Sequence, residues 1–446
     1  MPETIVVKFR DEVSLPYVDR VETHLRQRNI GAWDRIVNLF PGSTLRRLFT
    51  ALDPQEILEL VRRATNRAPA FEAPNFFAYF LLDCPRVRAD DLVQEFRSWP
   101  VVQNAYIDPP VVNPSVQTFA EDTRPLSQKQ EYLNEINAPF AWGQPGGLGR
   151  GQQVIDLEAG WTLNHQDLLA HGVPKPINID DRSRHHGTSV LGVICAGGGP
   201  DGYSGIAPDL AAVGVVSHGG KPTQIANAIL DAMDKLSFGD VLTLEVAVEG
   251  NMPCEAFSLN SLLLKNITMA TILGIVVVEA AGNAGAPSGD LDQYADSNGN
   301  NSLKRGDTAL EISPGVGFQD SGAIMVGAAT AAAPHLRLAS SNFGTRVDCY
   351  AWGENVYAPS SDTTGATDLY DDNFGRTSGA TAIIAGVALA VQGMAEAKRG
   401  VRFDPKRLRQ ILSNERNGTP NGTPGNEGSE LIGVMPDLKK IFANEL

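Results

Sequence analysis

The feature that most constrains the fold is a regular alternation of apolar strand patterns with helical patterns after residue 150. Strands joined through helices run parallel, and a parallel sheet needs helices on both of its faces. The sequence therefore predicts an α/β fold in which a mostly parallel sheet forms the middle of three layers. The expected strands are 153–156, 210–216, 241–248 and 275–280, and the expected helices are 186–196, 223–236 and 258–273.

The chain has 446 residues, which is too long for one average domain. Residues 1–115 carry three strand patterns and two helical ones, which predicts a smaller α+β domain. One of its helices begins at Asp53-Pro54, because Asp is a favoured N-cap and Pro a favoured first helical residue. Residues 116–129 show neither period and are expected to form a linker, which leaves 130–446 as the main domain.

The composition is that of a soluble globular protein, with 42% hydrophobic and 20% charged residues. A formal net charge of -15 argues against nucleic acid or an anionic membrane as a partner, since both attract clustered Lys and Arg. The four cysteines are far apart, so they are expected to be reduced thiols. No basic segment followed by an apolar one opens the chain, and no run of 18 apolar residues occurs, so a cytoplasmic protein is expected. Secretion would require that a leader has been removed from this sequence.

The segment Phe374-Gly-Arg-Thr-Ser-Gly-Ala-Thr-Ala-Ile-Ile-Ala-Gly386 surrounds one serine with small residues and then becomes an apolar helix. A serine at a helix N-terminus has free backbone N–H groups beside it, which can bind a developing negative charge. Ser378 is therefore a candidate nucleophile. Taken alone, the segment fits a Ser/Thr helix cap equally well.

Three further polar residues follow expected strands or open an expected helix, where working residues of parallel sheets gather. Asp156 ends one strand, His186 opens a helix, and Asn283 follows the strand 275–280. Each has an ordinary structural explanation, as a turn residue or a buried histidine. Together with Ser378 they supply the four parts of acyl transfer: a nucleophile, a base, an orienting acid and an oxyanion donor.

Each of these four segments resembles a motif of the subtilisin-like serine proteases, the subtilases. Val154-Ile-Asp156 is similar to the aspartate motif, and His186-Gly-Thr-Ser-Val-Leu-Gly resembles H-G-T-x-V-x-G. Ala281-Gly-Asn-Ala-Gly resembles the oxyanion asparagine loop, and Thr377-Ser-Gly-Ala resembles the serine motif. The order Asp, His, Ser is that of subtilisin. The resemblance covers about 130–400 and implies a subtilisin-like fold with a serine endopeptidase activity.

The chain departs from the family pattern near two of the four residues. Leu157 and Glu158 follow Asp156, where subtilases have Thr or Ser and then Gly, and Arg376 replaces the glycine before Thr-Ser. In the serine motif the usual proline is Ala382. None of these changes removes a proton carrier.

Three other classes of protein share part of this residue pattern. Sedolisins use Glu and Asp in place of His, but His186 and Asn283 hold the positions where such an enzyme would differ. A serine esterase of the α/β-hydrolase type needs a G-x-S-x-G elbow and a histidine last in the chain, which this sequence lacks. A catalytically silent subtilase-like scaffold that binds a peptide partner remains the alternative, supported by the altered flanks.

The resemblance implies that Ser378 attacks a peptide carbonyl, that His186 carries the proton and that Asp156 fixes the imidazole tautomer. The Asn283 side chain and the Ser378 N–H would bind the oxyanion. The substrate is a protein or peptide whose backbone pairs with an edge strand at 244–248, so that Leu244, Glu245 and Val246 are the expected substrate-binding residues. Glu245 or Glu249 would favour a basic side chain at the scissile position.

Subtilases commonly carry a small α+β propeptide, and residues 1–115 resemble it in element order. We therefore expect the chain's own N-terminal domain to act as an inhibitor in a zymogen, with cleavage within 109–128. Subtilases also often bind calcium, and six oxygen-bearing residues follow Asn283: Asp290, Asp292, Asp296, Asn298, Asn300 and Asn301. Their spacing is not that of an EF-hand, so we interpret them as a polar insertion and predict neither a metal nor a cofactor.

Overall fold

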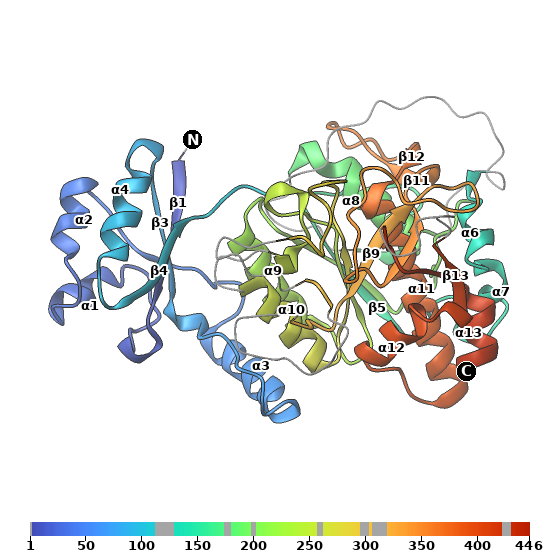
Figure 1. Cartoon of the computed structure of the whole chain (residues 1–446), viewed down its shortest axis with the longest axis horizontal. Coiled ribbons are helices and arrows are strands. Elements are labelled where there is room, and N and C mark those ends of the chain that lie inside the picture. The colour runs from blue at the N-terminus through green and yellow to red at the C-terminus, as the bar shows by residue number, and fades with distance from the viewer. Residues whose placement is uncertain are drawn as a thin grey trace.

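The computed structural model describes residues 2–111, 129–173, 180–197, 202–256, 262–294, 303–305, 319–421 and 430–446. Figure 1 shows a smaller N-terminal unit beside a larger body that the rest of the chain forms. The N-terminal unit, residues 2–111, contains a four-stranded sheet, and the larger body contains an eight-stranded sheet. Most of the linker expected at 116–129 lies outside the described residues.

The N-terminal sheet is antiparallel, with strand order β2-β3-β1-β4. Side chains alternate between the two faces of a strand. Along β1, Ile5 and Val7 belong to a core formed with the unit's own helices, whereas Val6 belongs to the core that extends into the larger body. The elements are β1 Pro2–Phe9, α1 Glu22–Gln27, α2 Trp33–Leu39, β2 Arg46–Arg47, α3 Pro54–Arg67, β3 Tyr79–Pro85, α4 Arg86–Arg97 and β4 Val102–Ile107.

Helix α3 begins where the sequence predicted. Asp53 is its N-cap and accepts from the backbone N–H groups of Gln55 and Glu56, while the Glu56 side chain accepts from the Asp53 N–H. This capping box satisfies donors that the first helical turn leaves without a partner. The predicted helix start at Asp53-Pro54 is confirmed.

The larger body is built on a sheet with strand order β13-β14-β10-β9-β8-β7-β5-β6. All its neighbouring pairs are parallel except β13 with β14, so the predicted mostly parallel sheet is confirmed. The strands of the larger body, including the separate pair β11 and β12, are β5 Gln153–Glu158, β6 Ala212–Ser217, β7 Val241–Leu244, β8 Val276–Ala280, β9 Ile324–Ala329, β10 Cys349–Trp352, β11 Val356–Ser360, β12 Leu369–Phe374, β13 Gly418–Pro420 and β14 Val434–Pro436.

Helices cover this sheet in two groups. Helices α9 and α10 pack on each other and against α3, so they lie between the sheet and the N-terminal unit (Figure 1). Helices α8 and α11 pack against one another, and α11 also packs on β8, β9 and β10. The helices are α6 Tyr132–Glu135, α7 Ala138–Trp142, α8 Arg184–Cys195, α9 Pro222–Lys235, α10 Leu262–Leu273, α11 Arg376–Arg399, α12 Pro405–Leu412 and α13 Leu438–Glu445.

Helix α11 is long and apolar enough to cross a membrane by length and composition alone. Its most apolar window is nevertheless fully buried within the fold. A helix that is apolar on all sides is expected in the core of a large domain. We therefore interpret α11 as the central core helix of the larger body.

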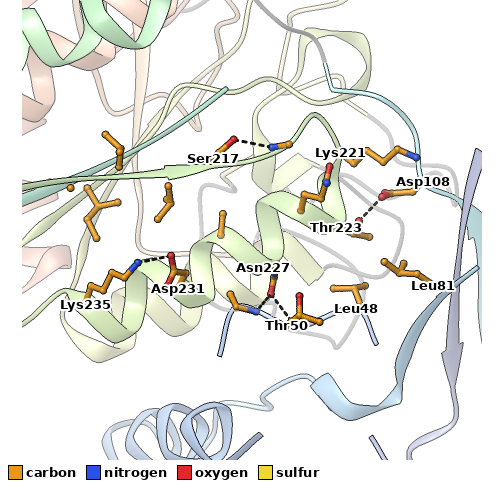
Figure 2. A pocket seen from close by; sticks show the side chains of 18 of the residues that line it. Leu48, Thr50, Leu81, Asp108, Ser217, Lys221, Thr223, Asn227, Asp231 and Lys235 are labelled. Atoms are coloured by element: carbon orange, nitrogen blue, oxygen red, sulfur yellow. Dashed lines mark hydrogen bonds and ion pairs between the residues drawn. The ribbon is translucent and has the colours of Figure 1, made fainter. Parts of the chain in front are cut away.

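The N-terminal unit contacts the larger body through hydrogen bonds at the start and along the length of α9. Asp108 accepts from the Thr223 hydroxyl at 2.5 Å, and the Asn227 side-chain oxygen accepts from the Thr50 and Ala51 N–H groups at 3.1 Å. Figure 2 shows these contacts around a cavity of about 1090 Å³ between the two parts. None of the predicted catalytic residues lines this cavity.

Two further contacts extend this interface in opposite directions. The Arg67 guanidinium at the end of α3 donates to the Leu273 carbonyl at 2.5 Å, next to the end of α10. At the end of the N-terminal unit, the Val111 N–H donates to the Gly220 carbonyl at 2.9 Å. The end of the N-terminal unit at Val111 thus lies against the larger body.

Candidate active site

The residues that the sequence singled out come from four elements of the larger body. Asp156 lies within β5, and His186 lies in the first turn of α8. Asn283 follows β8, and Ser378 lies in the first turn of α11. Because the carboxyl ends of parallel strands meet at one edge of the sheet, this edge is where their side chains gather.

The residue that contacts the His186 ring is Glu158. Its Oε1 atom lies 2.6 Å from His186 Nδ1, and both side chains are buried. Neither of these two atoms has another hydrogen-bond partner in the described part of the chain. The second carboxylate oxygen, Oε2, accepts from the Ala159 N–H at 3.2 Å. A carboxylate held at this distance fixes the orientation and tautomer of an imidazole.

Asp156 is engaged elsewhere, so the prediction that it orients His186 is wrong. Its Oδ2 accepts from the Trp161 indole N–H at 2.7 Å, and its Oδ1 accepts from the Thr243 hydroxyl at 2.8 Å. Complete burial, together with the neighbouring Glu158 carboxylate, raises the pKa of Asp156 well above its usual range. Asp156 is a structural member of the site, between β5 and β7.

The pleat of β5 explains why the two carboxylates differ. Asp156 and Glu158 are two residues apart, so both point to the same face of the strand, with Glu158 about 6.6 Å nearer its carboxyl end. His186 lies at that end, and only Glu158 reaches it. The sequence carries a signal for this, because Glu158-Ala-Gly160 has the acid-x-Gly spacing that subtilases show. Glu158 stands two residues after Asp156.

Helix α11 presents Ser378 in its first turn. Gly375 precedes the helix, and a Cβ added to it would lie 2.1 Å from the Gly353 carbonyl oxygen, so only glycine fits here. Arg376 follows with φ at 54°, in the left-handed region. The ring of Phe374, just before this turn, lies 5.5 Å from the His186 ring with its plane at 74°. The packing of α8 against α11 therefore brings the His186 and Ser378 turns to one place.

Asn283 is tied to the same turn. Its side-chain oxygen accepts from the Thr377 N–H at 3.2 Å and from the Thr377 hydroxyl at 3.0 Å. Its own N–H donates to the Asn251 carbonyl at 3.0 Å. With the carbonyl half of the amide committed to Thr377, the NH₂ group is the half that is left to donate. The helix gives the neighbouring Ser378 N–H no intrahelical acceptor.

Asn342 holds the Asn283 loop, which is a role that the sequence did not reveal. Its side-chain NH₂ donates to the Ala281 carbonyl at 2.7 Å, and its side-chain oxygen accepts from the Ala284 N–H at 2.8 Å. Gly282 between them has φ at 94°, which favours glycine. The signal was the segment Ser340-Ser-Asn-Phe-Gly344, which resembles a subtilase segment, but its partner in space could not be read from it.

The segment expected to bind substrate has a different structure from the one that the sequence predicted. Strand β7 ends at Leu244 and lies between β5 and β8, so residues 245–248 follow an inner strand and do not form the expected edge strand of the large sheet. That Leu244, Glu245 and Val246 bind substrate stays a prediction. Leu244, Glu245 and Val246 are all buried. Neither carboxylate oxygen of Glu245 has a hydrogen-bond partner in the described residues. Burial, with Glu158 and Asp156 nearby, raises the pKa of Glu245 well above its usual range.

The oxygen-rich segment after Asn283 is described only in part. Asp296, Asn298, Asn300 and Asn301 lie outside the described residues. Asp290 accepts from the Asp292 N–H at 3.0 Å, and Asp292 accepts from the Thr345 hydroxyl at 2.6 Å. Across the described ranges no group of three or more potential metal-binding side chains occurs.

Comparison with known proteins agrees with this arrangement. A family model described as Peptidase_S8, Subtilase family, matches residues 162–429. Since this match covers more than half of the chain, the protein belongs to the subtilase family. The matched region includes His186, Asn283 and Ser378 and begins just after Glu158.

Curated relatives from several bacteria resemble part of the chain. The alkaline elastase YaB of Bacillus sp. (strain YaB) is 29% identical over 251 residues, which is 51% of this chain and 64% of that protein. Thermitase of Thermoactinomyces vulgaris is 30% identical over 179 residues, 38% of this chain and 60% of that protein. Mycosin-3 of Mycobacterium tuberculosis is 27% identical over 238 residues, 45% of this chain and 51% of that protein. The match spans less than two thirds of each relative's length.

Two solved structures share the fold over the whole chain. One is fervidolysin from Fervidobacterium pennivorans, a keratinolytic enzyme related to subtilisin, with a TM-score of 0.59 and 15% identity over 100% of this chain and 61% of that one. The other is the epidermin leader peptide processing serine protease of Staphylococcus aureus, with a TM-score of 0.58 and 14% identity over 100% of both chains. At these identities the likeness concerns the fold, which is subtilisin-like.

Proposed function

We propose that this protein is a serine endopeptidase that hydrolyses peptide bonds through an acyl-enzyme, with Glu158, His186 and Ser378 as its triad. The observation that carries the proposal is the 2.6 Å contact between Glu158 Oε1 and His186 Nδ1. With Nδ1 bound to a carboxylate, the proton of a neutral imidazole lies on Nδ1 and Nε2 is free to accept one. His186 is thereby prepared as a general base.

In the proposed mechanism, His186 Nε2 takes the proton of the Ser378 hydroxyl as its oxygen attacks the substrate carbonyl. The imidazolium that forms is stabilised by Glu158 and then gives its proton to the leaving amine. The Asn283 NH₂ group and the Ser378 N–H donate to the oxyanion of the tetrahedral intermediate. Water repeats the sequence on the acyl-enzyme and releases the acid product.

The alternative is a catalytically silent subtilase-like scaffold that binds a peptide. The observation in its favour is Arg376, which holds a left-handed backbone conformation two residues before Ser378. A fluorophosphonate probe separates the two functions, because it labels only an activated serine. We expect labelling of the wild type and none of Ser378→Ala, whereas an unlabelled wild type freed of its N-terminal unit would support the scaffold.

We further propose that the N-terminal unit is an inhibitory prodomain and that the protein is made as a zymogen. The contacts of Asp108 with Thr223 and of Val111 with Gly220 support this, because they lay the end of the unit along the larger body. Cleavage within 109–128 would separate the two parts. Intact mass spectrometry tests it: a mixture of full-length and shortened species is expected for the wild type, and only the full-length mass for Ser378→Ala. A single full-length mass in both, together with activity, would contradict self-processing.

A further inference from the structure

A third carboxyl lies next to the Glu158–His186 pair. Strands β5 and β7 are in parallel register, with Asp156 opposite Thr243 and Leu157 opposite Leu244. Asp156 and Thr243 are hydrogen-bonded, so their side chains share one face of the sheet. Glu158 follows Leu157 at the end of β5, and Glu245 directly follows the last residue of β7, so the two residues are neighbours where the strands end, with the strands about 4.8 Å apart.

The three carboxyl groups differ sharply in their partners. Asp156 accepts from two side-chain donors. Glu158 contacts the His186 ring and accepts from a backbone N–H. Glu245 is 4% exposed, and neither of its oxygens has a hydrogen-bond partner in the described part of the chain. An ionised carboxylate without a donor or a cation is very costly to bury.

The charges that face Glu245 add to this cost. The neighbouring carboxyl groups of Glu158 and Asp156, both on β5, act with burial to raise its pKa. His186 contacts Glu158, the Glu158 charge also acts on His218, and burial lowers the pKa of His218. When like charges share a buried site, one of the groups holds a proton. Asp156 has two donors and Glu158 has the His186 ring, whereas Glu245 has no partner for its ionised form in the described residues, so Glu245 is the group that holds the proton.

We propose that Glu245 is a positioning residue that remains protonated in the working enzyme. This inference rests on the proposed function, and it concerns how strongly the Glu158–His186 pair binds its proton. A second negative charge beside Glu158 would stabilise the imidazolium form of His186. At a given pH, a smaller fraction of His186 would then be neutral and able to act as a general base. A neutral Glu245 adds no second negative charge to that of the Glu158 carboxylate, which contacts His186.

The test compares Glu245→Gln with Glu249→Gln. Glutamine keeps the shape of glutamate and is neutral at every pH, and Glu249 is an exposed carboxylate four residues further along the same segment. Both changes are first made in Ser378→Ala, where no proteolysis interferes. Infrared difference spectra at neutral pH should show that Glu245→Gln loses the C=O band of a protonated carboxylic acid, whereas Glu249→Gln loses only a carboxylate band.

The second readout is the pH profile of kcat/KM in the active protein. Its acid limb reports the protonation of the free general base. Because glutamine mimics the neutral acid, Glu245→Gln should keep the acid limb within about 0.3 pH units and kcat within about threefold of the wild type. Glu245→Met, which is also neutral, should keep the acid limb too, so a variant that fails to fold does not end the test.

Other outcomes overturn the proposal. If Glu245→Gln loses a carboxylate band, or moves the acid limb to lower pH, then Glu245 is ionised in the native protein. If activity falls only on peptides with Lys or Arg at the scissile position, then Glu245 is a ligand for a substrate cation. The proposed function fails separately: an unlabelled Ser378 in the fluorophosphonate experiment would refute the endopeptidase while the infrared result on Glu245 still stands.

Discussion

Glu158 Oε1 and His186 Nδ1 lie 2.6 Å apart, and each has no other hydrogen-bond partner in the described residues. The contact joins the last residue of β5 to the first turn of α8. In a buried site, where few waters compete, a charge-assisted contact of this kind is strong. In the proposed mechanism this contact makes Glu158 the orienting acid, while Asp156 accepts from Trp161 and Thr243.

Exchanging the two carboxylates for amides should separate these tasks. Glu158→Gln removes the charge that stabilises the imidazolium and allows the wrong tautomer, so kcat should fall by roughly 10⁴-fold. Asp156→Asn, measured in parallel on the same peptide, should lower kcat by less than about tenfold, since Asp156 does not contact His186. An equal loss in both variants would contradict the assignment.

Asp156→Asn should instead destabilise the fold. Asp156 accepts from both Trp161 and Thr243, and an amide has only one oxygen with which to accept. One buried donor would lose its partner, which costs about 1–3 kcal/mol. Urea unfolding of Ser378→Ala with and without Asp156→Asn measures this loss, and Glu249→Gln serves as an exposed control. A change below about 0.5 kcal/mol would mean that the two donors are not needed.

The Asn283 amide should contribute to the transition state and not to substrate affinity. Asn283→Ala is expected to lower kcat by roughly 10²–10³-fold, a range measured on a member of this family, with KM nearly unchanged. Asn342→Ala should lower kcat as well, because Asn342 holds the loop through Ala281 and Ala284. Unchanged kcat in Asn283→Ala would remove it from the oxyanion hole.

Arg376 should be replaceable by glycine, and Gly375 should not be replaceable at all. A left-handed conformation costs a residue with a Cβ about 1–2 kcal/mol, partly offset by the greater flexibility of unfolded glycine. Arg376→Gly is therefore expected to stabilise the protein by about 0.5 kcal/mol. Gly375→Ala should abolish labelling of Ser378, since its Cβ would meet the Gly353 carbonyl at 2.1 Å. If Arg376→Gly also leaves kcat and KM unchanged, the arginine has no role in selectivity.

Asp108 should make the docking of the N-terminal unit sensitive to pH. Burial raises the pKa of Asp108 from 3.8 to about 6, although the Thr223 hydroxyl partly opposes this. Because the pKa is raised in the folded protein, the stability that Asp108 contributes is present below about pH 4 and is lost as the pH rises to about 6. Two pKa units correspond to about 3 kcal/mol.

The measurement compares full-length Ser378→Ala with and without Asp108→Asn by thermal unfolding at pH 4.5 and 6.5. Asparagine is neutral at both values, so the melting temperature of the Asp108 protein should fall more between them than that of Asp108→Asn. If the melting temperatures of the two proteins fall equally between pH 4.5 and 6.5, the pKa of Asp108 is not raised in the folded protein. Asp231, a partly exposed partner of Lys235 on the same helix, provides the control. Asp231→Asn should leave the difference in melting temperature between the two pH values unchanged.

Strand β5 shows most clearly which parts of the site could be predicted from the sequence. Strand and helix periods were enough to predict the parallel sheet. Local motifs were enough to place His186 and Ser378 at the starts of helices and Asn283 after a strand. The periods did not separate Asp156 from Glu158, although the acid-x-Gly spacing of Glu158-Ala-Gly160 was a signal in favour of Glu158. Both carboxylates lie on the same face of one strand, and only the position of α8 decides which of them meets the His186 ring.

The sequence by itself determined the strands β5 to β8 and the helices between them, because apolar periodicity, caps and small-residue turns act on neighbours along the chain. The tertiary structure alone decided which side chains meet. It enclosed β7 between β5 and β8, buried Glu245 where no described residue is its hydrogen-bond partner, and laid Val111 against Gly220. These outcomes depend on strand order and helix packing, which bring together residues that are distant in the chain. The local sequence around each of these residues does not specify such contacts.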